Sequence, residues 1–172
     1  LLRRLFDEGE FLGPYGVRSL SAAYRGGATI DVGGTAMSIA YDPGESSTGL
    51  FGGNSNWRGP VWFPINVLLA DGLLSYAAGV GSALTVEFPT GSGSRIPLDE
   101  AAGRIHDRLI ALFRPGPDGR RPGTPRDHPT GPLWDAHPTF AEYFDGDTGR
   151  GCGASHQTGW TALVAHLICT RP

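Results

Sequence analysis

The residues with the clearest capacity for chemistry lie near the end of the chain, in AEYFDGDTGRGCGASHQTGW, Ala141 to Trp160. Glu142 is a carboxylate beside two aromatic residues, and a glycine-rich acidic turn separates it from Gln157 and Trp160. A carboxylate at the end of a short helix could act as a general base. It could equally be a surface glutamate, so the residue type alone leaves its role open.

A second group of candidates comes just before the longest apolar stretch, in NSNWRGPVWF, Asn54 to Phe63. Indole rings stack on the C–H faces of sugars, while amide and guanidinium groups bind hydroxyls. The alternative is that the tryptophans belong to the core and the asparagines cap a helix. Glu45, in the preceding segment DPGES, is a further candidate. The residues of this segment that we expect to contact a sugar are Asn56, Trp57, Arg58 and Trp62.

Several other kinds of site are excluded by residue type and spacing. The histidines are not spaced as metal ligands, and neither HExxH nor CxxC occurs, so we expect no metal and no cofactor. The segment DGDTG is typical of a turn and lacks the further ligands of a calcium loop. A net charge of −3 predicts binding neither to nucleic acid nor to a membrane surface.

Composition also bears on location and folding. No apolar run reaches the roughly 18 residues that span a membrane, so no membrane association is predicted. Cys152 and Cys169 form no metal or disulfide pattern and are interpreted as reduced thiols of a cytoplasmic protein. The 172 residues, 40% of them hydrophobic, suffice for one domain with a core.

Hydrophobic spacing predicts the elements that must position these residues. Helices are expected over 60–76, 97–113 and 158–169, with one or two helical turns in 138–144. A β-hairpin is expected over 29–41, around Gly33-Gly34. The segment 114–135 is dense in proline and glycine and is predicted to be a long loop. Residues 1–8 look like the end of a helix already under way, which indicates a piece of a longer chain. The fold class expected is all-α with a small β-hairpin.

Together, two motifs resemble the C-terminal part of family 63 glycoside hydrolases. They are NSNWRGPVWFPIN at 54–66 and EYFDGDTGRGCGASHQTGWTALVA at 142–165. The chain is most similar to the bacterial mannosylglycerate and glucosylglycerate hydrolase-like group, and more distantly to trehalases and processing α-glucosidase I. The opening EFLGPYGVRSLS has the same resemblance, which therefore covers most of the chain.

The resemblance implies that residues 1–172 are the C-terminal portion of a single (α/α)6 barrel catalytic domain. Such a domain hydrolyses an α-linked glucosyl or mannosyl bond with inversion of the anomeric configuration. Glu142 falls where the family has its general base. Gln157 and Trp160 fall on its substrate-contacting loop and last helix, and Trp57, Arg58 and Trp62 fall on its sugar-binding stretch. The partners implied are a carbohydrate substrate and the missing N-terminal part of the same barrel.

The family's general acid is an aspartate far upstream of the base, so we expect it before Leu1 and expect the 172 residues alone to be inactive. Two alternatives to an inverting hydrolase of this group remain. One is a non-catalytic carbohydrate-binding or interaction module. The other is an enzyme of the trehalase or glucosidase I kind.

Overall fold

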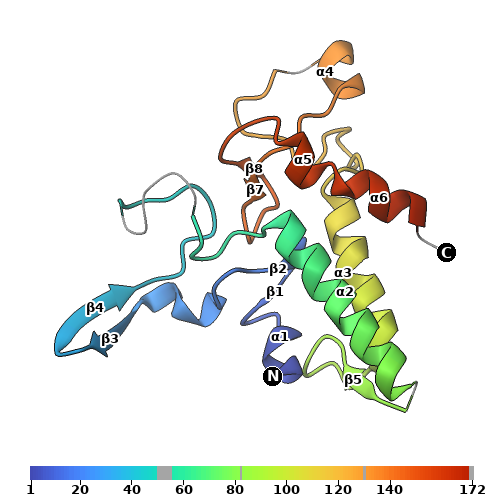
Figure 1. Cartoon of the computed structure of the whole chain (residues 1–172). Helices are drawn as coiled ribbons and strands as arrows, with labels where there is room; N and C mark the ends of the chain where they lie inside the picture. Colours follow the sequence, from blue (N-terminus) through green and yellow to red (C-terminus); the bar gives the residue numbers. More distant parts are fainter. Residues whose placement is uncertain (50–55, 82, 130, 171–172) are drawn as a thin grey trace.

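The computed structural model describes residues 1–49, 56–81, 83–129 and 131–170 (Figure 1). The helices are α1 (Leu2–Leu5), the 3-10 helix η1 (Ala22–Gly26), α2 (Phe63–Val80), α3 (Leu98–Ala111), α4 (Pro132–Ala136), α5 (Thr158–Thr161) and α6 (Leu163–Thr170). The strands are β1 (Leu12–Gly13), β2 (Gly16–Val17), β3 (Ala28–Val32), β4 (Thr35–Ile39), β5 (Thr85–Glu87), β6 (Arg95–Pro97), β7 (Tyr143–Phe144) and β8 (Gly151–Cys152).

The two long helices, α2 and α3, lie side by side and run in opposite directions (Figure 1). The apolar residues of α3 recur at the spacing of one helix face, and the structure buries that face almost completely. Full burial of a leucine or isoleucine side chain contributes about 1.5–3 kcal/mol, so this stripe is a large part of the core. The stripe consists of Leu98, Ala101, Ala102, Ile105 and Leu109, each at most 1% exposed.

A buried asparagine fastens α2 to the N-terminal hairpin β1–β2. The Asn66 side-chain oxygen accepts from the backbone N–H of Val17 at 2.6 Å, and its nitrogen donates to the Val17 carbonyl at 3.0 Å. Gly16 has φ +145°, and a Cβ there would lie 2.9 Å from the Asn66 oxygen. The hairpin can therefore approach α2 this closely only because residue 16 is glycine.

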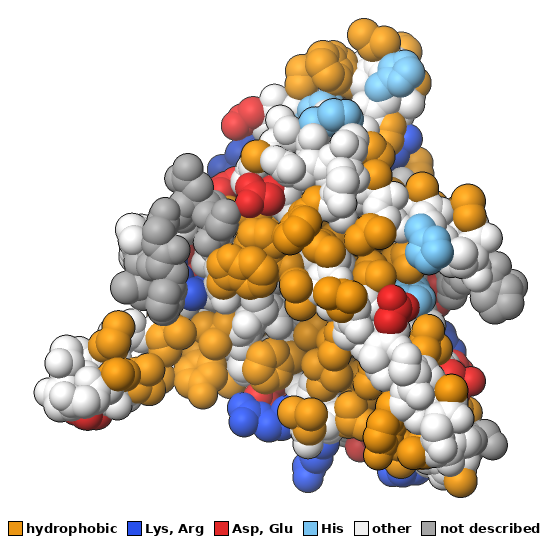
Figure 2. Space-filling view, in the orientation of Figure 1, with side chains coloured by type: hydrophobic (Ala, Val, Ile, Leu, Met, Phe, Trp, Pro, Cys, Tyr) orange, Lys and Arg blue, Asp and Glu red, His pale blue; other side chains and the backbone are white. Residues whose placement is uncertain are grey.

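The outward face of α2 is apolar and exposed. Ile65, Leu68 and Tyr76 are 45%, 67% and 59% exposed, and hydrophobic side chains gather over the middle of this face of the molecule (Figure 2). With a mean hydropathy of 1.4 over 18 residues, α2 is long and apolar enough to span a membrane. Length and composition alone do not distinguish such a span from a helix of a soluble domain, and α2 packs against α3.

The β-hairpin expected over 29–41 is confirmed as β3–β4. Thr29 pairs with Ser38 and Val32 with Thr35, so the turn consists of Gly33 and Gly34. Both glycines have positive φ, +61° and +83°, as a two-residue hairpin turn of this hand requires. The hairpin projects away from the helices, and its residues are largely exposed (Figure 1).

The expectation of an all-α fold is wrong. Only 36% of the described residues are helical, and they also form four two-stranded antiparallel sheets: β1–β2, β3–β4, β5–β6 and β7–β8. Three of these sheets have strands of two or three residues. Strands so short contain too few side chains for an alternating pattern to appear in the sequence. The described residues form a helix pair flanked by hairpins and loops, and nothing in them supports the expected (α/α)6 barrel.

Element positions differ from the predicted ones mainly near the end of the chain. The helical turns expected in 138–144 lie earlier, at Pro132–Ala136, and residues 143–144 form strand β7 instead. The helix expected over 158–169 is divided at Ala162, where ψ is −2°. The helices expected over 60–76 and 97–113 are confirmed as α2 and α3, with their ends shifted by a few residues.

Candidate active site

A short backbone pairing brings the two candidate segments together, although about eighty residues of sequence separate them. Val61 and Phe144 exchange two backbone hydrogen bonds, of 2.8 and 2.9 Å. Neighbouring side chains along an extended segment point to opposite faces. Val61 and Phe144 therefore enter the main core, while Trp62 and Tyr143 pack against each other in a separate cluster.

Four aromatic rings form this second cluster, three of them predicted sugar contacts. Trp62 is 3% exposed, and its ring stacks on Trp57 with centroids 4.0 Å apart and an angle of 4°. Tyr143 stacks on Trp62 with ring centroids 4.8 Å apart. Trp160 contacts Trp62 edge-on, with centroids 6.3 Å apart. The Trp62 indole N–H donates to the backbone carbonyl of Asn56 at 2.9 Å, which fixes the ring. Trp57 and Trp160 remain 45% and 37% exposed, so the cluster presents indole surface to solvent.

Two carboxylates, Glu142 and Glu45, are bound by consecutive backbone amides of one turn. Ala154 N–H donates to Glu142 Oε2 at 3.0 Å, and Gly153 N–H donates to Glu45 Oε1 at 2.8 Å. The Tyr143 hydroxyl donates to Glu45 Oε2 at 2.9 Å. Burial, reinforced by this bond to Glu45, raises the pKa of Tyr143, so the hydroxyl stays protonated and remains a donor.

The turn that carries these amides accommodates only glycine at position 153. Gly153 has φ +70°, and a Cβ there would lie 2.6 Å from the Tyr143 ring and 2.7 Å from Glu142 Oε2. The Tyr143 ring and the Glu142 carboxylate therefore both lie against Gly153. Glu142 is half-buried and lies at the edge of the aromatic cluster, next to the tyrosine that stacks on Trp62.

Asn56 and Arg58 are buried, 2% and 5% exposed, and their polar groups are occupied by the chain itself. The Arg58 guanidinium donates to Asp42 Oδ2 and to Ser46 Oγ, both at 3.0 Å. The Asn56 side-chain nitrogen donates to the Asp42 carbonyl at 2.7 Å. These contacts hold the loop that carries Glu45. The direct sugar contact expected of Asn56 and Arg58 from the sequence stays a prediction.

Gln157 and Trp160 flank the start of α5, at the rim of the cluster. Gln157 is exposed and is fixed through its backbone, whose N–H donates to the Phe140 carbonyl at 2.7 Å. Trp160 lies one turn further along α5, where its ring reaches Trp62. Asn54, which belongs to the same sequence motif as Trp57, lies outside the described residues.

An ionic network outside the cluster ties hairpin β7–β8 to the N-terminal part of the chain. Asp147 accepts two hydrogen bonds from Arg25, both of 2.7 Å, and one of 2.9 Å from the Tyr41 hydroxyl. Arg18 lies 3.5 Å away. Burial opposes ionisation of Asp147, but the bonds from Arg25 and Tyr41 outweigh it and lower its pKa. The DGDTG segment is thus a turn, as predicted, with Asp145 accepting from the backbone N–H of Asp147 and of Thr148.

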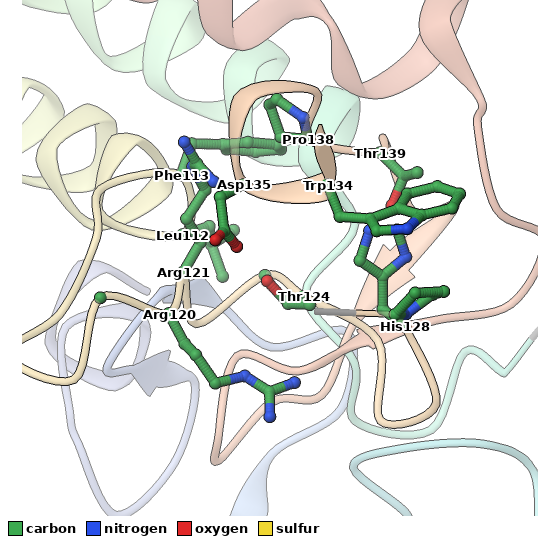
Figure 3. Close-up of a pocket in the computed structure, with 13 residues that line it drawn as sticks. Leu112, Phe113, Arg120, Arg121, Thr124, His128, Trp134, Asp135, Pro138 and Thr139 are labelled. Carbon is green, nitrogen blue, oxygen red and sulfur yellow. The ribbon is translucent and has the colours of Figure 1, made fainter. Parts of the chain in front are cut away.

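One groove adjoins the candidate site, and a smaller cavity lies apart from it. A groove of about 690 Å³ runs from Glu45 and Gly153 toward Arg126 and Arg150. A separate cavity of about 30 Å³, large enough for a water molecule, is enclosed by Phe113, Thr124, Trp134 and their neighbours (Figure 3). No candidate residue from the sequence lines the small cavity. Among the described residues, no group of three or more histidine, cysteine, aspartate or glutamate side chains could hold a metal ion.

Sequence reasoning did not single out Tyr143 as a site residue, although the structure stacks its ring on Trp62 and bonds its hydroxyl to Glu45. A signal was present, because Tyr143 directly follows Glu142 in the motif. The exposed indoles and neighbouring carboxylates are together typical of sites that bind and hydrolyse carbohydrates.

Comparison with known proteins gives the family. A family model described as "Mannosylglycerate hydrolase MGH1-like glycoside hydrolase domain" matches residues 1–161, so the chain belongs to this glycoside hydrolase family. The resemblance to family 63 glycoside hydrolases is therefore confirmed.

Two yeast proteins are similar over nearly the whole chain. The "Uncharacterized protein YMR196W" of Saccharomyces cerevisiae is 48% identical over 98% of the chain, and the "Probable mannosyl-oligosaccharide glucosidase" of Schizosaccharomyces pombe is 25% identical over 98%. The chain spans 16% and 15% of the length of these relatives. The expected bacterial origin is not supported, since both are yeast proteins.

Proposed function

We propose that the chain carries the general base and part of the sugar-binding surface of an inverting α-glycoside hydrolase that acts on a glucosyl- or mannosyl-containing substrate. The observation that carries the proposal is the Glu142 carboxylate, oriented by the Ala154 N–H at the edge of a cluster of four aromatic rings. The family membership supports the reaction class.

In this reaction Glu142 accepts a proton from a water molecule as that water attacks the anomeric carbon. A sugar ring stacked on the exposed face of Trp57, with Trp160 beside it, would present its anomeric carbon toward the carboxylate. The indoles exclude bulk water from the reacting face, and the hydrogen bond from the Ala154 N–H fixes the orientation of the carboxylate.

The general acid belongs in a segment outside these residues. An inverting mechanism places the acid about 6.5–9.5 Å from the base, on the opposite face of the sugar. Glu45 does not fit this role, because its oxygens accept from Tyr143 and Gly153 and face the same turn as Glu142. We therefore propose that another part of the catalytic domain supplies an aspartate, and that the 172 residues alone are inactive.

The exposed apolar face of α2 is consistent with another segment of the domain packing against it. Leu68, 67% exposed, and Tyr76, 59% exposed, would be covered by another helical segment of the same domain. The neighbouring helix α3 needs no such cover, since its own apolar stripe is buried against α2 and the hairpins.

The decisive experiment is hydrolysis by the full-length protein with Glu142→Gln. General base catalysis contributes about 10²–10⁴-fold, so kcat should fall by that factor while sugar binding persists. Glu100→Gln, an exposed glutamate on α3, is the matched control and should retain full activity. The anomeric form of the product, followed by NMR, tests inversion.

The same variant separates the enzyme from a carbohydrate-binding module. A module would bind sugar equally well with glutamate or glutamine at position 142 and would hydrolyse nothing in either form. Hydrolysis by the wild type that survives Glu142→Gln unchanged would refute the role of Glu142 as the base.

A further inference from the structure

A second groove lies on the far side of the loop that follows α3, and arginines dominate its lining. It measures about 640 Å³ and adjoins the Glu45 groove, because Arg126 and Arg150 line both. Arg120 lines it further along, with Tyr15 and Thr148 beside it. The two grooves thus connect the carboxylate site with a strongly basic surface.

The loop that supplies these arginines is held in place by hydrogen bonds. Gly123 N–H donates to the Leu112 carbonyl at 2.8 Å, and Gly116 N–H donates to the Arg120 carbonyl at 2.7 Å. A Cβ on Gly151 would lie only 2.6 Å from the Gly123 carbonyl, so the loop packs tightly on β8. Arg120 and Arg121 extend in opposite directions from this loop, and Arg120 points away from the small cavity (Figure 3).

Two of the arginines that line the groove form no ion pair among the described residues, and a third forms only a long one. Six arginines elsewhere form ion pairs at 2.6–3.5 Å, namely Arg4, Arg18, Arg25, Arg58, Arg104 and Arg108. Within the described residues, the guanidinium groups of Arg120 and Arg126 make no hydrogen bond or ion pair, and Arg150 reaches Asp145 only at 3.9 Å. Asp118 also lines the groove, but its Oδ1 accepts from the backbone N–H of Arg120.

We propose that this groove binds a small anion, the phosphate or carboxylate group of a metabolite. Guanidinium groups match the geometry of both anions and bind them through paired, charge-assisted hydrogen bonds. Tyr15 and Thr148, which carry hydroxyl groups, also line the groove. The net charge of −3 disfavours a long nucleic acid, since the chain as a whole repels polyanions and only the groove attracts negative charge.

The test is direct binding by calorimetry on the full-length protein, at constant ionic strength set with chloride. The probes are inorganic phosphate, which represents a phosphoryl group, and citrate, which represents carboxylates. We expect saturable binding of at least one of them, and the preferred probe identifies the source of the anion. The proposal is independent of hydrolase activity, because binding is the measured quantity.

Variants assign the site. Arg126→Gln and Arg150→Gln should each weaken the preferred probe by about tenfold, since each removes a charged donor. Arg3→Gln is the control. Arg3 is exposed on α1 and does not line the groove, and its substitution by glutamine removes the same charge. Circular dichroism verifies that each variant is folded.

Three results would overturn the proposal. The first is no saturable binding of either probe by the wild type. The second is an equal loss of affinity in Arg3→Gln and Arg126→Gln, which would reflect net charge alone. The third is tighter binding of a short single-stranded oligonucleotide than of both small anions, which would assign the groove to a nucleic acid.

Discussion

The α2–α3 core and the carboxylate site at Glu142 are held together by different forces. The core depends on apolar area, with α3 residues such as Ile105 and Leu109 fully buried between helix and hairpin. The site depends on single hydrogen bonds, such as that from Ala154 to Glu142. Changes in the core should therefore alter stability with little effect on the chemistry of folded molecules. Changes at the site should do the reverse.

The two long helices differ from each other in a related way. The apolar residues of α3 lie on one face, which is buried, while those of α2 surround the helix, and Leu68 is 67% exposed. An apolar side chain stabilises the fold only where it leaves water. The two helices thus give matched positions at which the contribution of burial can be measured.

The largest effect on stability is expected from Ile105→Ala in α3. Loss of a fully buried isoleucine removes apolar contact and leaves a cavity, so the free energy of unfolding should fall by about 2–5 kcal/mol. Leu68→Ala on α2 is the matched control and, in the 172 residues alone, should change it by about 0.5 kcal/mol or less, as at most surface positions. Urea unfolding measures both. Equal losses would mean that Leu68 is buried in the folded protein, against a segment that covers α2.

Gly153→Ala should disturb the site more than its position in a turn suggests. Its φ of +70° is unfavourable for alanine, and the added Cβ would collide with Tyr143 and Glu142. We expect a loss of about 1–3 kcal/mol in stability and a fall in the kcat of the full-length protein, because the turn that orients Glu142 must shift. Gly119→Ala is the control, since it has φ +77° but nothing within 4 Å. Equal losses in Gly119→Ala and Gly153→Ala would mean that the positive φ alone, and not the collision with Tyr143 and Glu142, causes the loss.

Glu45→Gln tests whether the second carboxylate acts by holding the turn. The amide has one acceptor oxygen, so it cannot accept from both Tyr143 and Gly153 in the same way. We expect faster hydrogen exchange at the Gly153 amide and a kcat about tenfold lower, with a smaller change in KM. Tyr143→Phe removes only one of the two contacts and should have a smaller effect. An unchanged exchange rate in Glu45→Gln would contradict this role.

The smallest effect concerns pH and the network at Asp147. Its pKa is lowered in the folded protein, so its contribution to stability is complete above the unfolded pKa, near 3.9. That contribution should be lost as the pH falls through the folded pKa. Asp147→Asn should therefore be less stable than wild type at pH 7, with the difference shrinking below about pH 4. Urea unfolding at several pH values measures it, and a difference that stays constant from pH 7 to pH 3 would contradict this role of Asp147.

How far prediction from sequence succeeded depended on the length of each element. Helices α2 and α3 have four or five turns, so their apolar spacing repeats often enough to be recognised. The β3–β4 hairpin was recognisable from Gly33-Gly34, because a two-residue hairpin turn of this kind needs two consecutive residues with positive φ. Strands β7 and β8 have two residues each, and the backbone bonds between Val61 and Phe144 join β7 to a segment that is distant in the sequence. No local pattern encodes such a pairing.

The candidate site shows the same division. Residue types were sufficient to select Glu142, Trp57, Trp62 and Trp160, because carboxylates and indoles are what sugar chemistry uses. They were not sufficient to assign roles. Arg58 has the chemistry of a sugar contact, yet it is buried in contact with Asp42. Only burial and partner geometry distinguish a residue that touches a ligand from one that supports the site.

The sequence by itself therefore determined the family and the two long helices, and it nominated the candidate site residues. These follow from motifs and from repeated apolar spacing, which are properties of neighbouring residues. The tertiary structure decided which indoles stack, that Tyr143 links Glu45 to the cluster, and that Arg120, Arg126 and Arg150 line one groove. Contacts between segments far apart in the chain arise from packing of the whole molecule, so no stretch of sequence specifies them alone.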